Sequence, residues 1–183
     1  MGVLKSHARP SAVLLLATSL FVGTPVSAAP DEGAVKAAFL LNFARLVSWP
    51  PGALPAERID VCIVGAGPSA EAASAMLAGK SVEGRRVEIR RTPASAGGIA
   101  GCHIVFVTDE GHASAAAVLR AARGRPLMIV GESEGFARQG AAINLYLEGG
   151  KVRFEVNLQA ARDAGLDFSS HMLRLARIVE PTE

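Results

Sequence analysis

The sequence predicts an α/β fold: a single domain with a mixed, mainly parallel sheet flanked by helices, ending in a β-hairpin and two helices. Three observations favour this class. Short continuous apolar runs alternate with segments of helical periodicity, as in parallel sheets whose strands are joined by helices. Alternating runs at residues 141–147 and 152–156 flank Glu148-Gly149-Gly150-Lys151, the pattern of a tight hairpin. No internal repeat or low-complexity linker divides the chain.

The first 28 residues have the layout of a secretory signal peptide. Lys5 and Arg9 precede an apolar run at residues 12–22, and Val26-Ser27-Ala28 offers the small residues that a signal peptidase reads. As a membrane anchor the apolar run is too short, because a spanning helix needs roughly 20 residues. No cysteine follows the run at a lipoprotein position. We therefore expect export, cleavage after this segment, and a mature domain at residues 29–183.

Composition does not indicate a basic, nucleic-acid-binding surface. The chain has 19 Lys and Arg and 17 Asp and Glu, and Lys5 and Arg9 lie in the leader, so 17 charges of each sign remain after residue 28. A formally neutral chain offers no general attraction for phosphate backbones, and we expect no nucleic-acid partner. The remaining length suits one domain with a single core.

Cys62 and Cys102 are the two cysteines of the chain. In an oxidising compartment such a pair is typical of a disulfide, whereas two buried thiols are commoner in the cytosol. The signal peptide favours the bond, and two unpaired core thiols stay the alternative because both residues flank apolar strands. A bridge would close a loop of 40 residues, for which the chain-entropy model gives about 4 kcal/mol of stabilisation.

A helix is predicted at residues 34–47, where Trp49-Pro50-Pro51 ends it. Its apolar side chains recur at helical spacing: Val35, Phe39, Phe43 and Leu46. Such a stripe is more often core than binding surface. Trp49 lies at the helix exit, where an amphipathic ring could line a groove.

The middle of the chain alternates strands and helices. Short apolar runs predict buried strands at residues 59–64, 103–107 and 127–130. Residues 85–91 predict a solvated edge strand with one buried face, since Val87 and Ile89 alternate with charged residues. Helices are predicted at residues 69–77 and 113–123, a loop at residues 94–101, and a short helical or turn segment at residues 132–140.

Gly65-Ala66-Gly67-Pro68 invites comparison with a nucleotide-binding loop, but the pattern is weak. The third glycine of the dinucleotide fingerprint is absent, no Gly-Lys-Ser/Thr follows, and Pro68 removes an amide donor. A plain strand-to-helix turn is favoured, with Pro68 near the first helical position and Ser69 near the cap.

Two helices are predicted after the hairpin. The first contains Leu158 and ends at Gly165, a glycine expected in a left-handed conformation. The second is capped by Ser169 or Ser170 and continues to the carboxyl end of the domain. Its apolar side chains recur at helical spacing: Met172, Leu173, Leu175, Ala176 and Val179.

Enzyme signatures are not found. No His-x-x-x-His or Cys-x-x-Cys pattern indicates a metal site, and no Gly-x-Ser-x-Gly elbow exposes a nucleophile. Cys102 and His103 are adjacent, so their side chains should point to opposite faces. We expect no catalytic residues, cofactor or metal. Asp109, Glu155 and His171 are the candidates that a hydrolase assembled from distant segments would use. Asp109 follows the end of the buried run at residues 103–107, a place where α/β folds often put ligand-contacting groups.

Arg153, Glu155 and Asn157 fall on one face of the second hairpin strand if it runs that far. We interpret them as a structural hydrogen-bond cluster at the strand end.

Three segments, VKAAFLLNFARLVSWP, GCHIVFV and VRFEVNLQAARDAGLDFSSHMLRLARIV, resemble the YfiR family of small periplasmic proteins, over residues 35–179. The resemblance implies a periplasmic repressor that binds the periplasmic sensing domain of an inner-membrane diguanylate cyclase and lowers cyclic-di-GMP, thereby controlling biofilm and motility. It implies three partners: the cyclase, an outer-membrane lipoprotein that sequesters the repressor, and a second copy in a homodimer. It also implies that Cys62–Cys102 joins neighbouring strands at the sheet centre.

A repressor needs a surface that binds one state of its partner better than the other. Our candidates come from the aromatic helix and from the last helix: Phe39, Phe43, Trp49, His171, Arg174 and Arg177. We expect the disulfide to be the redox-sensitive element, since its reduction would loosen the fold and weaken repression. The alternative function is a small-molecule sensor or carrier with a groove near Trp49 and His171.

Overall fold

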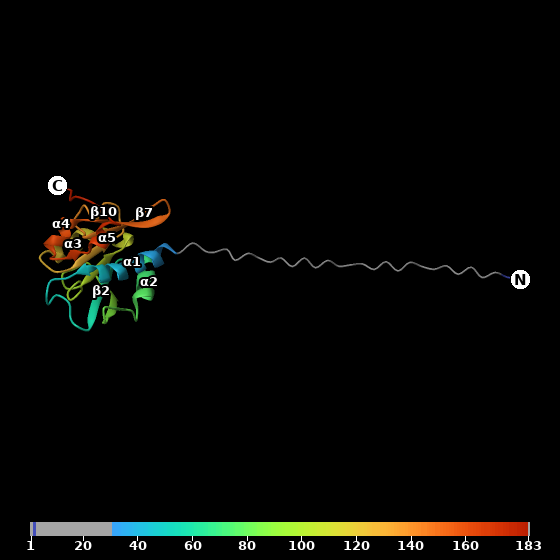
Figure 1. Cartoon of the computed structure of the whole chain (residues 1–183), viewed down its shortest axis with the longest axis horizontal. Coiled ribbons are helices and arrows are strands. Elements are labelled where there is room, and N and C mark those ends of the chain that lie inside the picture. Colours follow the sequence, from blue (N-terminus) through green and yellow to red (C-terminus); the bar gives the residue numbers. More distant parts are fainter. Residues whose placement is uncertain (1, 3–30, 183) are drawn as a thin grey trace.

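The computed structural model describes residues 2 and 31–182, and Figure 1 shows the folded part with its elements labelled. Apart from Gly2, the signal peptide predicted at residues 1–28 lies outside the described residues and stays a prediction.

An eight-stranded sheet in the order β10-β8-β7-β6-β5-β2-β4-β3 forms the centre of the fold. The five neighbouring strands β4, β2, β5, β6 and β7 are parallel to one another. Strand β3 is antiparallel to β4, β8 is antiparallel to β7, and β10 is parallel to β8. The predicted class, a mixed and mainly parallel sheet, is confirmed. The strands are β2 (Arg58–Val64), β3 (Ser81–Val82), β4 (Arg85–Arg91), β5 (Ile104–Val107), β6 (Met128–Gly131), β7 (Ile143–Glu148), β8 (Lys151–Val156) and β10 (Arg177–Ile178).

Helices cover both faces of this sheet. They are α1 (Glu32–Leu46), α2 (Gly67–Leu77), η1 (Asp109–Ser114), α3 (Ala115–Ala122), α4 (Leu158–Asp163) and α5 (Ser170–Leu173). One core cluster packs the sheet against α1, α2 and the α4–α5 segment, and a second packs its other face against α3. Figure 1 shows α1 and α2 side by side. A small antiparallel pair, β1 (Val47–Ser48) with β9 (Asp167–Phe168), ties the exit of α1 to the carboxyl-terminal segment.

The hairpin forms as predicted. Glu148 pairs with Lys151, so the loop contains only Gly149 and Gly150. Both glycines have positive φ, 56° and 72°, the backbone conformation that a two-residue turn of the favoured type needs and that glycine adopts most readily.

The carboxyl-terminal helix is much shorter than predicted. Ser169 caps it as expected, its Oγ accepting from Met172 N at 3.3 Å, but α5 ends at Leu173. The chain then turns into β10, and Val179 N donates to Val156 O at 2.9 Å. The predicted helix to Val179 is therefore wrong beyond its first turn. By pairing with β8, β10 satisfies backbone donors and acceptors that β8 would otherwise expose at the edge of the sheet.

Three other expectations are corrected. Ser69 does not cap α2, which begins at Gly67 with Pro68 in its first turn, because the Ser69 hydroxyl donates to Glu132 instead. Strand β4 is not the edge of the sheet, since the two-residue strand β3 pairs outside it. The helix predicted at residues 113–123 is divided into η1, which begins four residues earlier, and α3.

Candidate functional site

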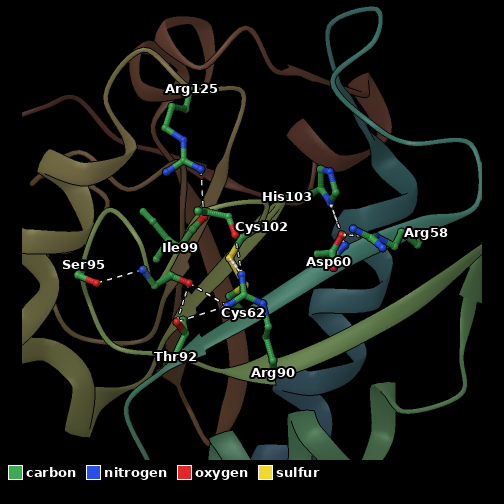
Figure 2. Close-up of a disulfide and its surroundings, with 12 residues drawn as sticks. Arg58, Asp60, Cys62, Arg90, Thr92, Ser95, Ile99, Cys102, His103 and Arg125 are labelled. Atoms are coloured by element: carbon green, nitrogen blue, oxygen red, sulfur yellow. Dashed lines mark hydrogen bonds and ion pairs between the residues drawn. A yellow bond between two sulfur atoms is a disulfide. The ribbon is translucent and has the colours of Figure 1, made fainter.

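The predicted disulfide between Cys62 and Cys102 is formed, and the alternative of two free thiols is excluded. Figure 2 shows the sulfur bridge joining β2 to the segment that leads into β5. The Cα atoms are 5.9 Å apart, both residues are buried, and β2 and β5 are neighbours in the sheet. The bridge thus joins two central strands, as the family resemblance implied.

Two arginines hold the loop that covers the bridge. Arg90 donates to Gly98 O at 2.9 Å and to Ala100 O at 2.7 Å, and its Nη2 lies 3.2 Å from the Sγ of Cys102. Arg125 donates to Ile99 O at 3.0 Å from the opposite side (Figure 2). Arg90 therefore binds loop carbonyls and the disulfide, a structural role.

His103 directly precedes β5, and its side chain contacts Asp60 of β2. Its Nδ1 accepts from Asp60 N at 2.9 Å and is 3.4 Å from Asp60 Oδ2 (Figure 2). Burial lowers the pKa of His103; Asp60 opposes this shift and Arg58 adds to it. The histidine thus serves as a neutral acceptor, and Cys102, in its disulfide, forms no thiol–imidazole pair with it.

A cavity of about 950 Å³ opens beyond the carboxyl ends of β2, β5 and β6. The chain runs from β2 outward to β4 and then returns to β5 on the other side of β2, so this edge is a topological switch point. Open α/β sheets bind ligands in the crevice at such a point. The cavity wall also includes the first turns of α1 and α2 and one face of β7, β8 and β10.

Glu132, which directly follows β6, organises one wall of the cavity. Its Oε2 accepts from Lys36 Nζ at 2.6 Å and from Ser69 Oγ at 2.8 Å, and its Oε1 accepts from Asp109 N at 3.0 Å. Lys36 also pairs with Glu32 at 2.5 Å. Burial works to lower the pKa of Lys36, but the bonds to Glu132 and Glu32 outweigh it and the pKa is raised. This network of hydrogen bonds and ion pairs joins four separate segments.

A polar row crosses β7, β8 and β10 on the other wall. Asn144 lies opposite Glu155, and Glu155 lies opposite Arg177 in the strand register. Arg177 donates to Glu155 Oε2 at 2.7 Å and lies 4.2 Å from the centre of the Tyr146 ring. Asn144 Nδ2 reaches Glu155 Oε1 at 3.5 Å, but Asn144 Oδ1 has no hydrogen-bond partner within the described residues.

The structure only partly groups the six surface candidates. Phe43 is 1% exposed and packs against Phe154, with ring centres 5.2 Å apart, so it offers no surface. Phe39 and Trp49 are partly buried and pack on the same core cluster.

The carboxyl-terminal candidates are exposed. His171 Nδ1 and Arg174 Nη2 are 3.4 Å apart, and of the six candidates only Arg177 lines the cavity. The groove expected near Trp49 and His171 is therefore not this cavity. Of the hydrolase candidates, Asp109 and Glu155 line it, but His171 does not.

The predicted cluster of Arg153, Glu155 and Asn157 is also only partly assembled. Glu155 pairs with Arg177, whereas Arg153 pairs with Glu148 at 3.8 Å, and both of these side chains are exposed. Asn157 caps α4 by accepting from Ala160 N at 2.9 Å, and its amide donates to Ala137 O at 2.7 Å.

Sequence reasoning missed Lys36, Glu132 and Asn144. Glu132 carries the same signal that singled out Asp109: a carboxylate directly after a buried strand. Lys36 is a charge within an otherwise apolar stretch of helix. Asn144 is a polar residue inside an apolar strand run.

Within residues 31–182, no group of three or more His, Cys, Asp or Glu side chains is placed to hold a metal ion. None of the helices in that part of the chain combines the length and the apolar character needed to cross a bilayer.

The chain belongs to the YfiR/HmsC-like family, whose model matches residues 33–177. The family is associated with periplasmic regulation of diguanylate cyclase signalling, and its members are regulators rather than catalysts. No curated protein is significantly similar to the sequence.

Two solved structures match this chain in a structural comparison. One is an ABC domain in complex with L-Trp from Streptococcus pneumonia, with a TM-score of 0.52, 10% identity, and coverage of 80% of this chain and 60% of that chain. The other is a conserved domain protein from Vibrio cholerae, with a TM-score of 0.48, 11% identity, and coverage of 78% and 59%. The chain thus spans about 60% of the length of these structures. At 10% identity the first likeness concerns the fold alone.

Proposed function

We propose that this protein is a periplasmic repressor of an inner-membrane diguanylate cyclase. After export and removal of residues 1–28, the mature domain binds the periplasmic domain of the cyclase and keeps its cytoplasmic output low. The observation that carries the proposal is the family match over residues 33–177. Repression requires tighter binding to the inactive state of the cyclase than to the active state, because equal binding would shift no population.

The proposed contact surface is the α5–β10 segment. Leu175 is 64% exposed and Ile178 is 43% exposed, and they are interleaved with the exposed cationic side chains of Arg174 and Arg177. Large apolar side chains beside arginine are typical of the residues that a protein interface buries. His171 extends this surface towards the cap of α5.

The decisive experiment measures cyclic-di-GMP in the native host. Deletion of the protein should raise the nucleotide level severalfold. The full chain should restore the low level, whereas residues 29–183 without their leader should not. In a strain whose cyclase has lost its active site, deletion should change nothing. An unchanged level in the strain with an active cyclase would refute the proposal.

Substitutions in the α5–β10 segment test the surface. Leu175→Arg/Ile178→Arg should weaken capture of the purified periplasmic domain of the cyclase by about tenfold or more, since hot-spot truncations cost about 2 kcal/mol. Met76→Arg is the matched control, because Met76 is 38% exposed but lies on α2. Equal weakening by both variants would place the interface elsewhere.

We also propose a homodimer and an outer-membrane lipoprotein partner, both of which are supported by the family resemblance. Light scattering coupled to size exclusion should give twice the mass of the mature chain. Capture from solubilised outer membranes should recover a lipoprotein that competes with the cyclase domain.

A further inference from the structure

The cavity at the switch point is strongly acidic, although the chain after residue 28 is formally neutral. Seven carboxylate and three basic side chains line it, a formal excess of four negative charges. Seven of the 17 acidic residues of the chain therefore lie around one cavity. A concave, partly desolvated surface with charge of one sign concentrates counter-ions of the opposite sign.

Two of the three basic groups are already paired. Lys36 is held by Glu132 and Glu32, and Arg177 is held by Glu155. Each of these two positive charges is thus offset by a carboxylate of the wall, although the Arg177 side chain itself is 52% exposed. Glu110 and Glu134 line the same cavity, follow β5 and β6, and are exposed. The charge left to face a ligand is negative.

Asn144 gives an independent indication of a ligand with hydrogen-bond donors. It lines the cavity, is 1% exposed, and its Oδ1 has no partner within the described residues. A buried acceptor without a donor is costly, and such groups are rare unless a bound molecule satisfies them. A donor group of the ligand at this wall would remove that cost.

The arrangement favours an organic cation over a metal ion. The carboxylates come from α1, from the segments after β5 and β6 and from β8, and within the described residues no three of them converge as metal ligands. Pro68, Tyr146 and Leu147 add apolar surface between the charged groups. Separated anions around an apolar wall match separated ammonium groups on an aliphatic chain.

We propose that this cavity binds a linear aliphatic di- or polyamine. The ammonium groups pair with Glu110 and Glu134, one amine donates to Asn144 Oδ1, and the methylene chain lies against Tyr146, which is on the same face of β7 as Asn144. Binding needs only this chain, so the proposal stands or falls independently of the cyclase.

The test is isothermal titration of the mature protein, residues 29–183, at low ionic strength. The probes share one chain length: hexamethylenediamine, the neutral hexanediol and the anionic adipate. The diamine should bind with one molecule per chain, and the diol and the diacid should bind about a hundredfold more weakly or not at all. Added Mg²⁺ should not displace the diamine at equal concentration.

Variants locate the binding. Glu110→Gln/Glu134→Gln should weaken diamine binding by about tenfold or more, because the two exposed carboxylates that pair with the diamine are lost. Glu57→Gln/Glu88→Gln removes the same charge from exposed positions outside the cavity and should bind as the unmodified chain does. Asn144→Leu should weaken binding while every carboxylate stays. If this variant does not fold, the two double variants still decide.

Any of four results overturns the proposal: no heat with the diamine, equal binding of adipate or hexanediol, displacement of the diamine by equimolar Mg²⁺, or equal weakening in both double variants. The last result would show attraction by net charge alone.

Discussion

At the scale of single residues, Glu132 connects the most segments of the candidate site. One carboxylate accepts from the Lys36 ammonium of α1, the Ser69 hydroxyl of α2 and the amide of Asp109 at the start of η1. Its side chain is only 3% exposed. A carboxylate so deeply buried is tolerated because both of its oxygens accept hydrogen bonds, and removing it leaves those donors without an acceptor.

We therefore expect Glu132→Ala to lower the free energy of unfolding by about 3 kcal/mol, the typical cost of breaking a buried pair. Urea unfolding followed by circular dichroism measures it. Glu148→Ala is the control, because its contact with Arg153 is exposed and 3.8 Å long, and should cost less than about 0.5 kcal/mol. Similar losses in both variants would contradict a buried role for Glu132.

His103 predicts a pH dependence of stability. Burial lowers the pKa of the folded imidazole below the ordinary value of about 6.5 that it has in the unfolded chain. Both states are neutral well above pH 6.5. As the pH falls through that value, the unfolded state binds a proton first, so the free energy of unfolding decreases until the folded pKa is reached.

Replacement of His103 tests this dependence. His103→Asn keeps an acceptor for Asp60 N but cannot titrate, so the decrease in unfolding free energy between about pH 6.5 and 5 should become smaller. Parallel urea series at each pH measure it. An unchanged slope in His103→Asn would show that this histidine is not the titrating group.

At the scale of elements, the turns and caps are set by local sequence, and the carboxyl-terminal segment is not. Gly149-Gly150 and Gly165 have the left-handed conformation that their positions predict. Met172 to Val179, in contrast, matches a helical period, yet the residues after Leu173 reach β8 and form β10. Short apolar segments fit a helix and an edge strand almost equally well, and only the position of β8 decides between them.

The same distinction separates what could be predicted of the site. Asp109 was expected at the end of a buried strand, a local signal. Lys36 and Glu132 are 96 residues apart, and only the order of the strands brings α1 against the end of β6. Asn144 is likewise paired with Glu155 by the hairpin register. Periodicity predicts which elements form, but not which side chains of distant elements meet.

Two glycines offer a matched test of helix termination. Gly124 follows α3 and Gly165 follows α4, each with φ of 68°. A Cβ at Gly124 would meet nothing within 4 Å, whereas one at Gly165 would lie 2.8 Å from Pro50 Cγ. Gly124→Ala should cost about 1 kcal/mol of backbone strain, and Gly165→Ala about 1–3 kcal/mol more from the added clash. Thermal unfolding of both variants measures the difference, and equal costs would show that Pro50 moves freely.

At the scale of the whole molecule, the disulfide lies before the amino end of β5, opposite to the cavity, and it meets β2 at Cys62, the fifth of its seven residues. Cys102 precedes the first residue of β5, while the cavity begins with Asp109, beyond its last residue. The bridge closes 40 residues that contain α2, β3 and β4. Its main effect should therefore be on the stability of the fold, with little effect on the geometry of the cavity.

This separation gives the last prediction. Cys62→Ala/Cys102→Ala should lower the free energy of unfolding by about 4 kcal/mol, because a loop of that length gains conformational freedom in the unfolded chain. Treatment with a reductant should give a similar loss.

Arg90→Gln is the control that keeps the bridge but removes the bonds to Gly98 O and Ala100 O, and it should lower the free energy of unfolding by only about 1–2 kcal/mol. Where the double variant is still folded, its diamine affinity should match that of the unmodified chain. A marked loss of diamine affinity in folded protein without the bridge would mean that the bridge shapes the cavity. If the double variant lost much less stability than Arg90→Gln, the covering loop, held by Arg90 and Arg125, would stabilise the centre of the sheet more than the covalent bond does.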